Sequence, residues 1–299
     1  MATPELQVGA QIDALPERQP WVSVLLDLIR KQPLGVFGAV IVLIMIFAAV
    51  FANVISPYDP EAASFEHMLE SPNADFWLGS DHFGRDIMTR LIYGARTALF
   101  VGFTSAFVGA TIGLVVGVAS AYFGGTFDII VQRIVDIVMA FPLIILALVV
   151  VATLGTGIVN VIIAITIPFI PQCARVVRSS ALAIREIPYV DAARALGFSH
   201  TRIILRHMVP NVMAPYLVLL TAFVGQAILL EASLSYLSLG VQEPTPAWGL
   251  MLQGGAEEFA ESAPWIPIFP GIAISLAVFG FNLFGDALRD VLDPKLRRD

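Results

Sequence analysis

Few residues of this sequence could do chemistry, and the common catalytic motifs are absent. A phosphate-binding loop needs a glycine followed by lysine and then serine or threonine, but neither of the two lysines, Lys31 and Lys295, follows a glycine. The HExxH and GxSxG patterns of hydrolases do not occur, and the lone Cys173 leaves no cysteine-pair metal site. We therefore expect a chain that is not an enzyme and that itself binds no cofactor and no metal.

Asp81, His82 and Asp86 are residues of metal-ligating types that lie close together in the stretch LGSDHFGRDIMTRLIYGAR. The same stretch has the pattern of a helix start. Ser80 or Asp81 can accept hydrogen bonds from the N–H groups of a first turn, and apolar residues follow at helical spacing. We therefore predict a capped helix here rather than a metal site.

A few polar residues fall inside apolar stretches, where they are costly unless they face protein or water. Arg133 and Asp136 are three residues apart and can pair on one helix face near the cytoplasmic end, rather than act in a transport pathway. Glu231 can either line a substrate passage or anchor a helix end, and the sequence leaves both open. Asn160 and Asn282 are expected to form hydrogen bonds between helices.

The composition places these residues in a membrane protein. Of the 299 residues, 57% are hydrophobic and only 14% are charged, with a mean hydropathy of +0.81. Soluble proteins carry about 25% charged residues. The first twenty residues are polar and acidic, without the basic start or the small-residue cleavage site of a signal peptide. We expect the chain to begin in the cytoplasm and to enter the membrane through an uncleaved helix.

The predicted fold is all-α, a polytopic membrane protein with six transmembrane helices. Each span offers most of the roughly 20 apolar residues that cross a bilayer. The six are Leu34–Ile55, Thr97–Tyr122, Ile129–Leu154, Gly157–Ile170, Val212–Leu237 and Ile266–Leu288. The fourth is short and carries Pro168, and we expect it to continue as a helix through Gln172–Ile184 into water.

Lys and Arg residues predict the orientation. Thirteen of the 17 lie before the first span, between the fourth and fifth spans, or after the last. The loop Gly240–Trp265 has no basic residue and carries four glutamates. By the positive-inside rule, both termini face the cytoplasm. The first loop, Ser56–Arg96, then lies outside, where its three arginines are outnumbered by seven acidic residues.

These predictions divide the chain into five parts. The N-terminal tail contains PWVSVLLDLIRKQP, which has the apolar face of a helix lying in the membrane interface, or which simply extends the first span. The parts are a cytoplasmic tail (1–33), the first span (34–55), an external loop (56–96), a five-helix core (97–290) with a cytoplasmic segment (185–210), and a C-terminal tail (291–299).

Small residues recur every four positions along the second span. Four-residue spacing keeps them on one helix face, where the missing side chains let another backbone approach closely. This pattern predicts a tight helix–helix contact, within this chain or with a partner subunit. The residues are Ser105, Gly109, Gly113, Gly117 and Ala121.

The stretch DAARALGFSHTRIILRHMVPN, residues 191–211, interrupts the apolar sequence with basic residues, two alanines and a glycine. Asp191 can cap a short helix, Ala192 and Ala193 keep it slim, and Gly197 permits the left-handed conformation that ends a helix. These features favour a compact helix that projects from the cytoplasmic surface into a groove on a partner protein. The alternative is a re-entry loop whose arginines merely follow the positive-inside rule.

The second half of this stretch is predicted to lead back to the membrane. Ser199 or Thr201 can begin a second helix after the glycine corner. Pro210 is expected to mark the point where the chain turns to re-enter the bilayer.

Here the sequence resembles the inner-membrane permease subunits of ABC importers. Their signature is Glu-Ala-Ala, three residues, Gly, nine residues, and Ile-x-Leu-Pro. Asp191-Ala192-Ala193, Gly197 and Val209-Pro210 match it, with Asp in place of Glu and His207 in place of Ile. The His207 replacement is similar to the peptide-transport branch. Two further stretches resemble the C-type subunit of dipeptide, oligopeptide or nickel permeases: Leu78–Arg96, with Gly84-Arg85-Asp86, and His207–Gly249, with Glu231-Ala232-Ser233-Leu234-Ser235.

The resemblance implies a division of labour between subunits. A homologous second permease would enclose the pathway with this chain, two ATPase subunits would use ATP and Mg, and an external binding protein would deliver the substrate. No nucleic-acid partner is expected, and the setting would be the bacterial inner membrane. The coupling helix of the family would correspond to Asp191, Ala192, Ala193, Ala195, Leu196, Gly197 and Phe198.

The expected function is therefore peptide import by alternating access, driven by ATPase subunits that push the coupling helix. The substrate itself stays open between dipeptides, longer peptides, nickel chelates and other solutes. The alternative is a subunit of a secondary transporter or channel driven by an ion gradient, in which residues 191–211 would be an ordinary basic loop.

Overall fold

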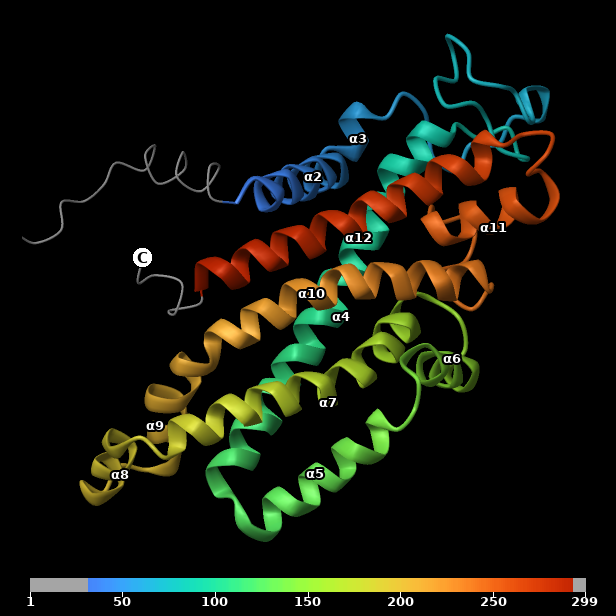
Figure 1. The fold of residues 1–299 in the computed structure, drawn as a ribbon. Helices are drawn as coiled ribbons and strands as arrows, with labels where there is room; N and C mark the ends of the chain where they lie inside the picture. The colour runs from blue at the N-terminus through green and yellow to red at the C-terminus, as the bar shows by residue number, and fades with distance from the viewer. Residues whose placement is uncertain (1–31, 293–299) are drawn as a thin grey trace, which may run out of the picture. The chain divides into compact units, whose positions relative to one another are not determined.

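A computed structural model describes residues 32–292, and this part of the chain is helical without a β-strand (Figure 1). The long helices are α2 (Pro33–Val50), α4 (Ile87–Phe123), α7 (Ile158–Arg185), α10 (Val209–Tyr236) and α12 (Trp265–Leu292). Shorter ones are α3 (Ala52–Ile55), η1 (Phe65–His67), α5 (Gly125–Met139), α6 (Leu143–Leu154), α8 (Pro188–Ala195), α9 (His200–Ile203), η2 (Ile204–Met208) and α11 (Trp248–Glu258). The predicted interfacial helix and both predicted tails lie largely outside the described residues.

Five helices are long and apolar enough to cross a membrane, or six if α5 and α6 together make one crossing. The segment His200–Tyr236 counts as one of the five, because α9, η2 and α10 run on without a break. The prediction of an all-α polytopic protein is confirmed. So is the continuation of the fourth span as a helix, which passes through Pro168 and reaches Arg185.

The third predicted span, Ile129–Leu154, is wrong as a continuous helix. The chain bends by 88° between α5 and α6. Pro142 explains the break, because it has no N–H to donate and its ring disfavours helical geometry at Phe141. The apolar run is therefore two helices joined by a corner.

The second predicted span starts ten residues too late. The structure begins α4 at Ile87, so the irregular part of the outer loop ends there rather than at Arg96. Asp86 caps the helix, and its carboxylate accepts a hydrogen bond from the N–H of Thr89 at 2.8 Å. The cap is therefore Asp86 and not Ser80 or Asp81.

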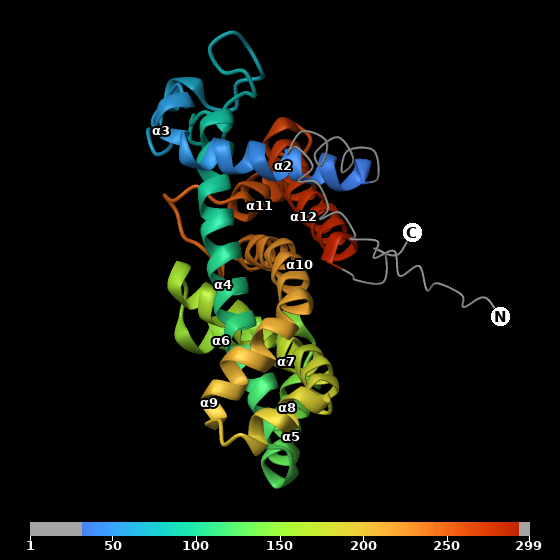
Figure 2. The ribbon, with the colours of Figure 1, turned by 90° about the vertical axis from the view of Figure 1, so that its left-hand side faces the viewer.

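The described helices form a layer of α12, α10 and α7 lying side by side, with α4 crossing behind them (Figures 1 and 2). Between α7 and α10, the rings of Phe169 and Phe223 stack with centroids 4.4 Å apart. Close glycine contacts join α2 to α12, where Gly38 faces Leu283 and Gly280 faces Ile41. The face of α7, α10 and α12 that points away from α4 is open.

Contacts between the helices give their directions. Residues later in α4 contact residues later in α7: Ser105 meets Ile162, and Ala121 meets Arg185. These two helices therefore run parallel. Parallel neighbours need a return connection, and α5 with α6 supplies it. By contrast α10 runs antiparallel to α4, since Tyr216 near its start meets Thr111 at 3.0 Å, whereas Val224 and Ile228 farther along α10 lie beside Gly102, earlier in α4.

Candidate functional site

Helix α8 is the first half of the segment that resembles a coupling helix. It begins at Pro188, whose fixed φ and missing N–H suit the first turn of a helix. Asp191 therefore lies inside the helix rather than at its cap, and the prediction that Asp191 caps it is wrong. Its carboxylate instead pairs with Arg194 at 3.0 Å, with both side chains on the surface.

A glycine corner ends α8 as predicted. Gly197 has φ +76°, a left-handed conformation that side chains disfavour. The N–H of Phe198 donates to the carbonyl of Ala193 at 3.1 Å, and the N–H of Gly197 donates to Arg194 at 2.9 Å. These two bonds satisfy the last carbonyls of the helix and fix the turn.

The second half of the segment continues directly into a membrane helix. Ser199 caps α9 by accepting from the N–H of Arg202 at 3.4 Å, as one of the two predicted starts. The π-helical turn η2 then joins α9 to α10. Pro210 lies in the first turn of α10, where it is tolerated, so the predicted change of direction at Pro210 does not occur.

The two alanines of the signature face opposite ways. Ala193 is 4% exposed and packs into its own chain, whereas Ala192 is exposed. The exposed surface here is therefore made by Ala192, Ala195 and Leu196, of which Leu196 is 74% exposed. Of the two alanines predicted to make a slim docking face, only Ala192 is therefore on the surface, and Ala193 is not.

The segment is tied to the end of α4. The hydroxyl of Tyr122 meets Nδ1 of His200 at 2.7 Å, and the guanidinium of Arg194 lies 5.3 Å over the Tyr122 ring. At the same place Arg185 donates to the carbonyl of Ala121 at 2.9 Å. A displacement of α8 would therefore pull on the end of α4.

The small residues of α4 face α7. A Cβ added to Gly113 would lie 2.6 Å from the Cβ of Cys173, and one added to Gly117 would lie 2.6 Å from the carbonyl oxygen of Ala174. Gly109 meets Phe169 in the same way, and Ser105 donates to the carbonyl of Ile162 at 3.4 Å. Together with Ala121, these residues let the two backbones approach closely within this chain.

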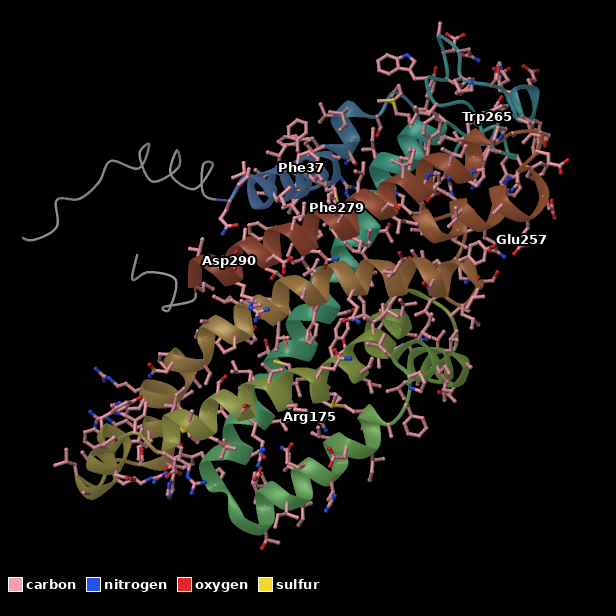
Figure 3. The ribbon with its side chains drawn as sticks, in the orientation of Figure 1. Phe37, Arg175, Glu257, Trp265, Phe279 and Asp290 are labelled. Atoms are coloured by element: carbon pink, nitrogen blue, oxygen red, sulfur yellow. The ribbon has the colours of Figure 1, made fainter. Side chains whose placement is uncertain are left out.

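Charged side chains join α5 to α7. Asp136 pairs with Arg175, which reaches from α7 (Figure 3), and more loosely with Arg133 at 3.9 Å. The predicted Arg133–Asp136 pair is thus present but is the weaker of the two. A further pair that was not predicted joins Asp128 to Arg178, whose Nε donates to the carboxylate at 2.6 Å.

Glu231 is buried near the end of α10 and is 1% exposed. Its carboxylate accepts a hydrogen bond from the hydroxyl of Ser235 at 2.7 Å, and that hydroxyl in turn accepts from the N–H of Val241. Of the two alternatives for Glu231, this arrangement favours anchoring the helix end and the turn that follows.

An ion cluster that was not predicted from the sequence, with two buried arginines, joins the outer loop to the chain after α10. Arg85 pairs with Asp81 and with Glu243, each at 2.7 Å. Arg90, which is fully buried, reaches Glu243 at 3.3 Å. Burial acts to lower the pKa of Arg85, but the two carboxylates outweigh it and hold that pKa above its ordinary value. We call these four residues the outer clamp.

The metal-type residues of the outer loop have other contacts. Asp81 belongs to the outer clamp, Asp86 caps α4, and His82 stacks on Phe259 with ring centroids 5.5 Å apart. Within residues 32–292, no group of three or more His, Cys, Asp or Glu side chains is placed to hold a metal ion.

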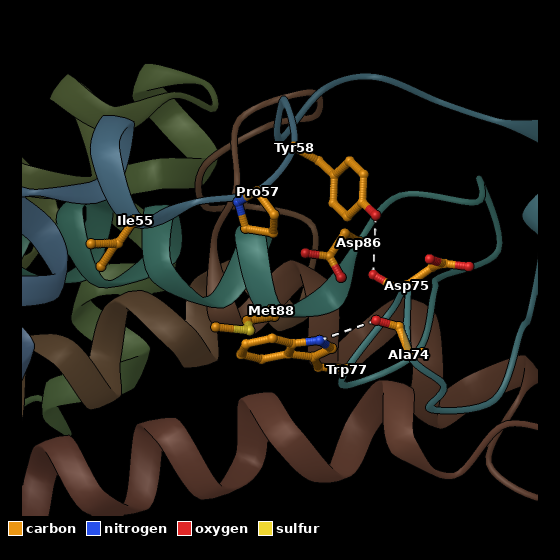
Figure 4. A pocket seen from close by; sticks show the side chains of 8 residues that line it. All are labelled: Ile55, Pro57, Tyr58, Ala74, Asp75, Trp77, Asp86 and Met88. Carbon is orange, nitrogen blue, oxygen red and sulfur yellow. Dashed lines mark hydrogen bonds between the residues drawn. The ribbon is translucent and has the colours of Figure 1, made fainter.

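A cavity of ≈ 240 Å³ lies where the outer loop meets the ends of α3 and α4 (Figure 4). The hydroxyl of Tyr58 donates to the carbonyl of Asp75, and the indole of Trp77 donates to Ala74. Aromatic side chains with a satisfied polar tip are typical of a membrane–water interface. The lining residues are Ile55, Pro57, Tyr58, Ala74, Asp75, Trp77, Asp86 and Met88.

Comparisons with known proteins agree with this architecture. Residues 109–298 match the family "binding-protein-dependent transport system inner membrane component", and residues 20–72 match the "N-terminal TM domain of oligopeptide transport permease C". In solved structures, a chain of the MetNI methionine ABC transporter has a TM-score of 0.57 and 22% identity over 69% of this chain and 98% of its own length. That likeness concerns the fold alone.

Curated relatives are similar over nearly the whole chain. The dipeptide transport system permease protein DppC of Alkalihalophilus pseudofirmus is 40% identical over 297 residues, which is 99% of this chain and 97% of that protein. The glutathione transport system permease protein GsiD of Shigella flexneri is 44% identical over 269 residues, 90% of this chain and 88% of that protein.

The family match and the curated relatives identify a membrane permease of the ABC importer class. The chain belongs to the family of binding-protein-dependent transport system inner membrane components. The alternative of an ion-gradient transporter or channel is not supported.

Proposed function

We propose that this chain forms half of the pathway of an ATP-driven peptide importer in a bacterial inner membrane. A homologous second permease supplies the other half, and an external binding protein delivers the peptide. Two ATPase subunits consume ATP and Mg, so this chain is not itself catalytic. The peptide substrate is proposed because curated relatives carry dipeptide and glutathione transport in their names.

The observation that carries the proposal is the exposed face of α8. Leu196 is 74% exposed at the tip of a rigid, glycine-ended turn. An apolar side chain held this way fits a groove on a partner, because its burial there is favourable by about 25 cal/mol per Å². The hydrogen bond between Tyr122 and His200 connects this tip to α4. Closure of the ATPases would therefore move α8 and α4 together.

The proposed coupling role of α8 also gives the orientation of the chain in the membrane. The start of α2 meets the end of α12, where Gly35 faces Ala287, so both ends of the described chain lie at one end of the helices. We assign that end, with α8, to the cytoplasm, because the described arginines Arg185, Arg194, Arg202, Arg206 and Arg289 belong to it.

Transport tests the proposal directly. The chain is reconstituted into vesicles with its partner subunits and binding protein, and uptake of labelled dipeptides is measured with and without ATP. ATP-dependent accumulation is expected. Uptake that follows an ion gradient in the absence of ATP would contradict the proposal.

Variants of α8 test the coupling role. Leu196→Asp and Gly197→Asp should each lower uptake at least tenfold and reduce co-purification of the ATPases, because one places a charge in the groove and the other strains the corner. The exposed Thr201→Ala serves as the matched control and should transport normally. If Leu196→Asp took up peptide normally and still co-purified with the ATPases, α8 would not be the element that contacts them.

A further inference from the structure

Four polar side chains in the membrane helices α10 and α12 are exposed, and within residues 32–292 they make no hydrogen bond or ion pair. Polar groups facing lipid are costly, so in membrane helices they usually face protein or water. We call them the polar face: Gln226, Asn282, Asp286 and Arg289.

On each helix these residues occupy positions other than those that contact α4, which are Val224 on α10 and Phe281 on α12. On α12 the residues Asn282, Asp286 and Arg289 are spaced by four and three, so they share one helix face. Gln226 lies on the corresponding face of α10, where its neighbours Val224 and Gly225 meet α4 and α12. Asn282 was expected to bond to another helix, but it has no such bond in the described chain.

The two amides lie at the same depth, close to the middle of both helices. A Cβ added to Gly225 would lie 3.4 Å from Oδ1 of Asn282, which places Asn282 beside the residue that precedes Gln226. Both α10 and α12 have 28 residues, and these amides fall within one turn of their centres. Asp286 and Arg289 follow toward the end that carries α8.

A cavity opens on this side of the layer toward the same end. Its volume is ≈ 440 Å³, within the range of about 300–1,000 Å³ that small-molecule sites occupy. Three helices line it, with Ser180 from α7, Pro215 from α10 and Arg289 from α12 among its residues. Arg289 is the member of the polar face that lines this cavity, so the polar face extends from near the centres of α10 and α12 to a cavity that is large enough for a short peptide.

We infer that Gln226 and Asn282 form a binding site for the peptide main chain inside the transport pathway. A primary amide offers both a donor and an acceptor, as a peptide group does, so it can bind any sequence without reading its side chains. Asp286 and Arg289 then face the two charged ends of a zwitterionic peptide as it leaves. This inference rests on the proposed function, and it adds where and by which chemistry the peptide is held.

Substitution with leucine tests the site in the reconstituted importer. Gln226→Leu and Asn282→Leu keep size but lose the amide, so each should raise the KM for uptake about tenfold. The factor should be similar for Ala-Ala, Phe-Phe and Lys-Glu, because the contact is with the main chain. Ser275→Ala is the matched control, since its hydroxyl already bonds to the carbonyl of Gly271 at 2.8 Å and its loss should leave KM unchanged.

Cysteine labelling gives a second, independent measurement. In a Cys173→Ala background, cysteines at 226 and 282 should react with a water-soluble thiol reagent, and a dipeptide should slow that reaction. If wild-type vesicles take up no peptide, the proposed function fails. If they do, but the leucine variants keep their KM or the cysteines stay unreactive, this inference alone is overturned. Loss of the second permease from the purified leucine variants would also overturn it, because the amides would then be subunit contacts.

Discussion

Gly113 is a residue at which the packing of α4 on α7 leaves no room for a side chain. A Cβ there would lie 2.6 Å from the Cβ of Cys173 and 2.7 Å from the carbonyl oxygen of Ile170, and the backbone oxygen cannot move aside cheaply. We expect Gly113→Ala to lower the free energy of unfolding by about 1–3 kcal/mol, the usual range for overpacking. The unfolding temperature of the purified protein in detergent, followed by tryptophan fluorescence, measures this.

Gly271 provides the control for that substitution. It also lies in a membrane helix, but a Cβ added there would have Leu252 as its nearest neighbour at 3.8 Å, an ordinary contact. Gly271→Ala should therefore be neutral or slightly stabilising, because glycine is a poorer helix former than alanine. Equal losses in the two variants would mean that the α4–α7 contact is not the cause.

His82 makes a pH-dependent contribution to stability. Burial lowers the pKa of His82 below its ordinary value, with the charge of Arg85 adding to the effect and Asp81 opposing it. The unfolded state then binds the proton more readily, so this contribution is complete above about pH 6.5 and is lost as the pH falls below that value.

We therefore expect wild-type protein to lose more stability than His82→Phe between pH 7.5 and pH 5.5. The phenylalanine keeps the stacking on Phe259 but cannot take up a proton. The extra fall in unfolding temperature should be on the order of 2 °C. If the unfolding temperatures of the two proteins fell equally with pH, protonation of His82 would not be the cause.

At the scale of single residues, the sequence predicted the features that depend only on neighbouring residues. The conformation of Gly197 and the cap at Ser199 follow from neighbouring residues, and the structure has both. Which alanine faces outward does not follow locally, because Ala193 is buried by packing against its own chain. The outer clamp could not be foreseen either, since Glu243 lies 158 residues beyond Arg85.

At the scale of elements, the outer clamp holds the loop before α4 to the chain after α10. Glu243 faces both Arg85 and the fully buried Arg90. We expect Glu243→Gln to cost about 1–3 kcal/mol of unfolding free energy. This is less than the 3–5 kcal/mol for breaking a fully buried pair, because the Glu243 side chain is 43% exposed.

Unfolding temperature again measures the effect, and Glu257→Gln is the matched control. Glu257 is an exposed glutamate of α11 (Figure 3) and makes no ion pair within residues 32–292. Its substitution should change stability little. If both variants lose the same amount, the clamp contributes nothing beyond surface charge.

Helix existence could be read from the sequence, but helix continuity could not. Apolar length identified each crossing, since lipid requires about 20 apolar residues per span. A single Pro142 breaks the third, whereas Pro168 and Pro171 remain inside α7, where its packing on α4 and α10 compensates for the missing hydrogen bonds. Composition cannot distinguish these cases, because neighbouring helices decide them.

At the scale of the whole molecule, the number of crossings follows from helix direction rather than from length. Because α4 and α7 run parallel, the end of α4 and the start of α7 lie at opposite ends of the helices. The bent pair α5–α6 must therefore carry the chain across. The backbone supports this, since the N–H of Gly157, at the end of the pair, donates to the carbonyl of Gly240 in the loop after α10.

Single cysteines in a Cys173→Ala background test this arrangement in intact cells with a membrane-impermeant maleimide. A cysteine at Thr156 should be labelled from outside, as should one at the exposed Glu257 on α11. A cysteine at the exposed Thr201 on α9, outside the proposed docking face of α8, should react only in inverted vesicles. Six crossings with the described ends on one side require this pattern. If Thr156→Cys and Thr201→Cys were instead labelled from the same side, α5–α6 would be a re-entrant hairpin, and the chain would have no crossing between the parallel helices α4 and α7.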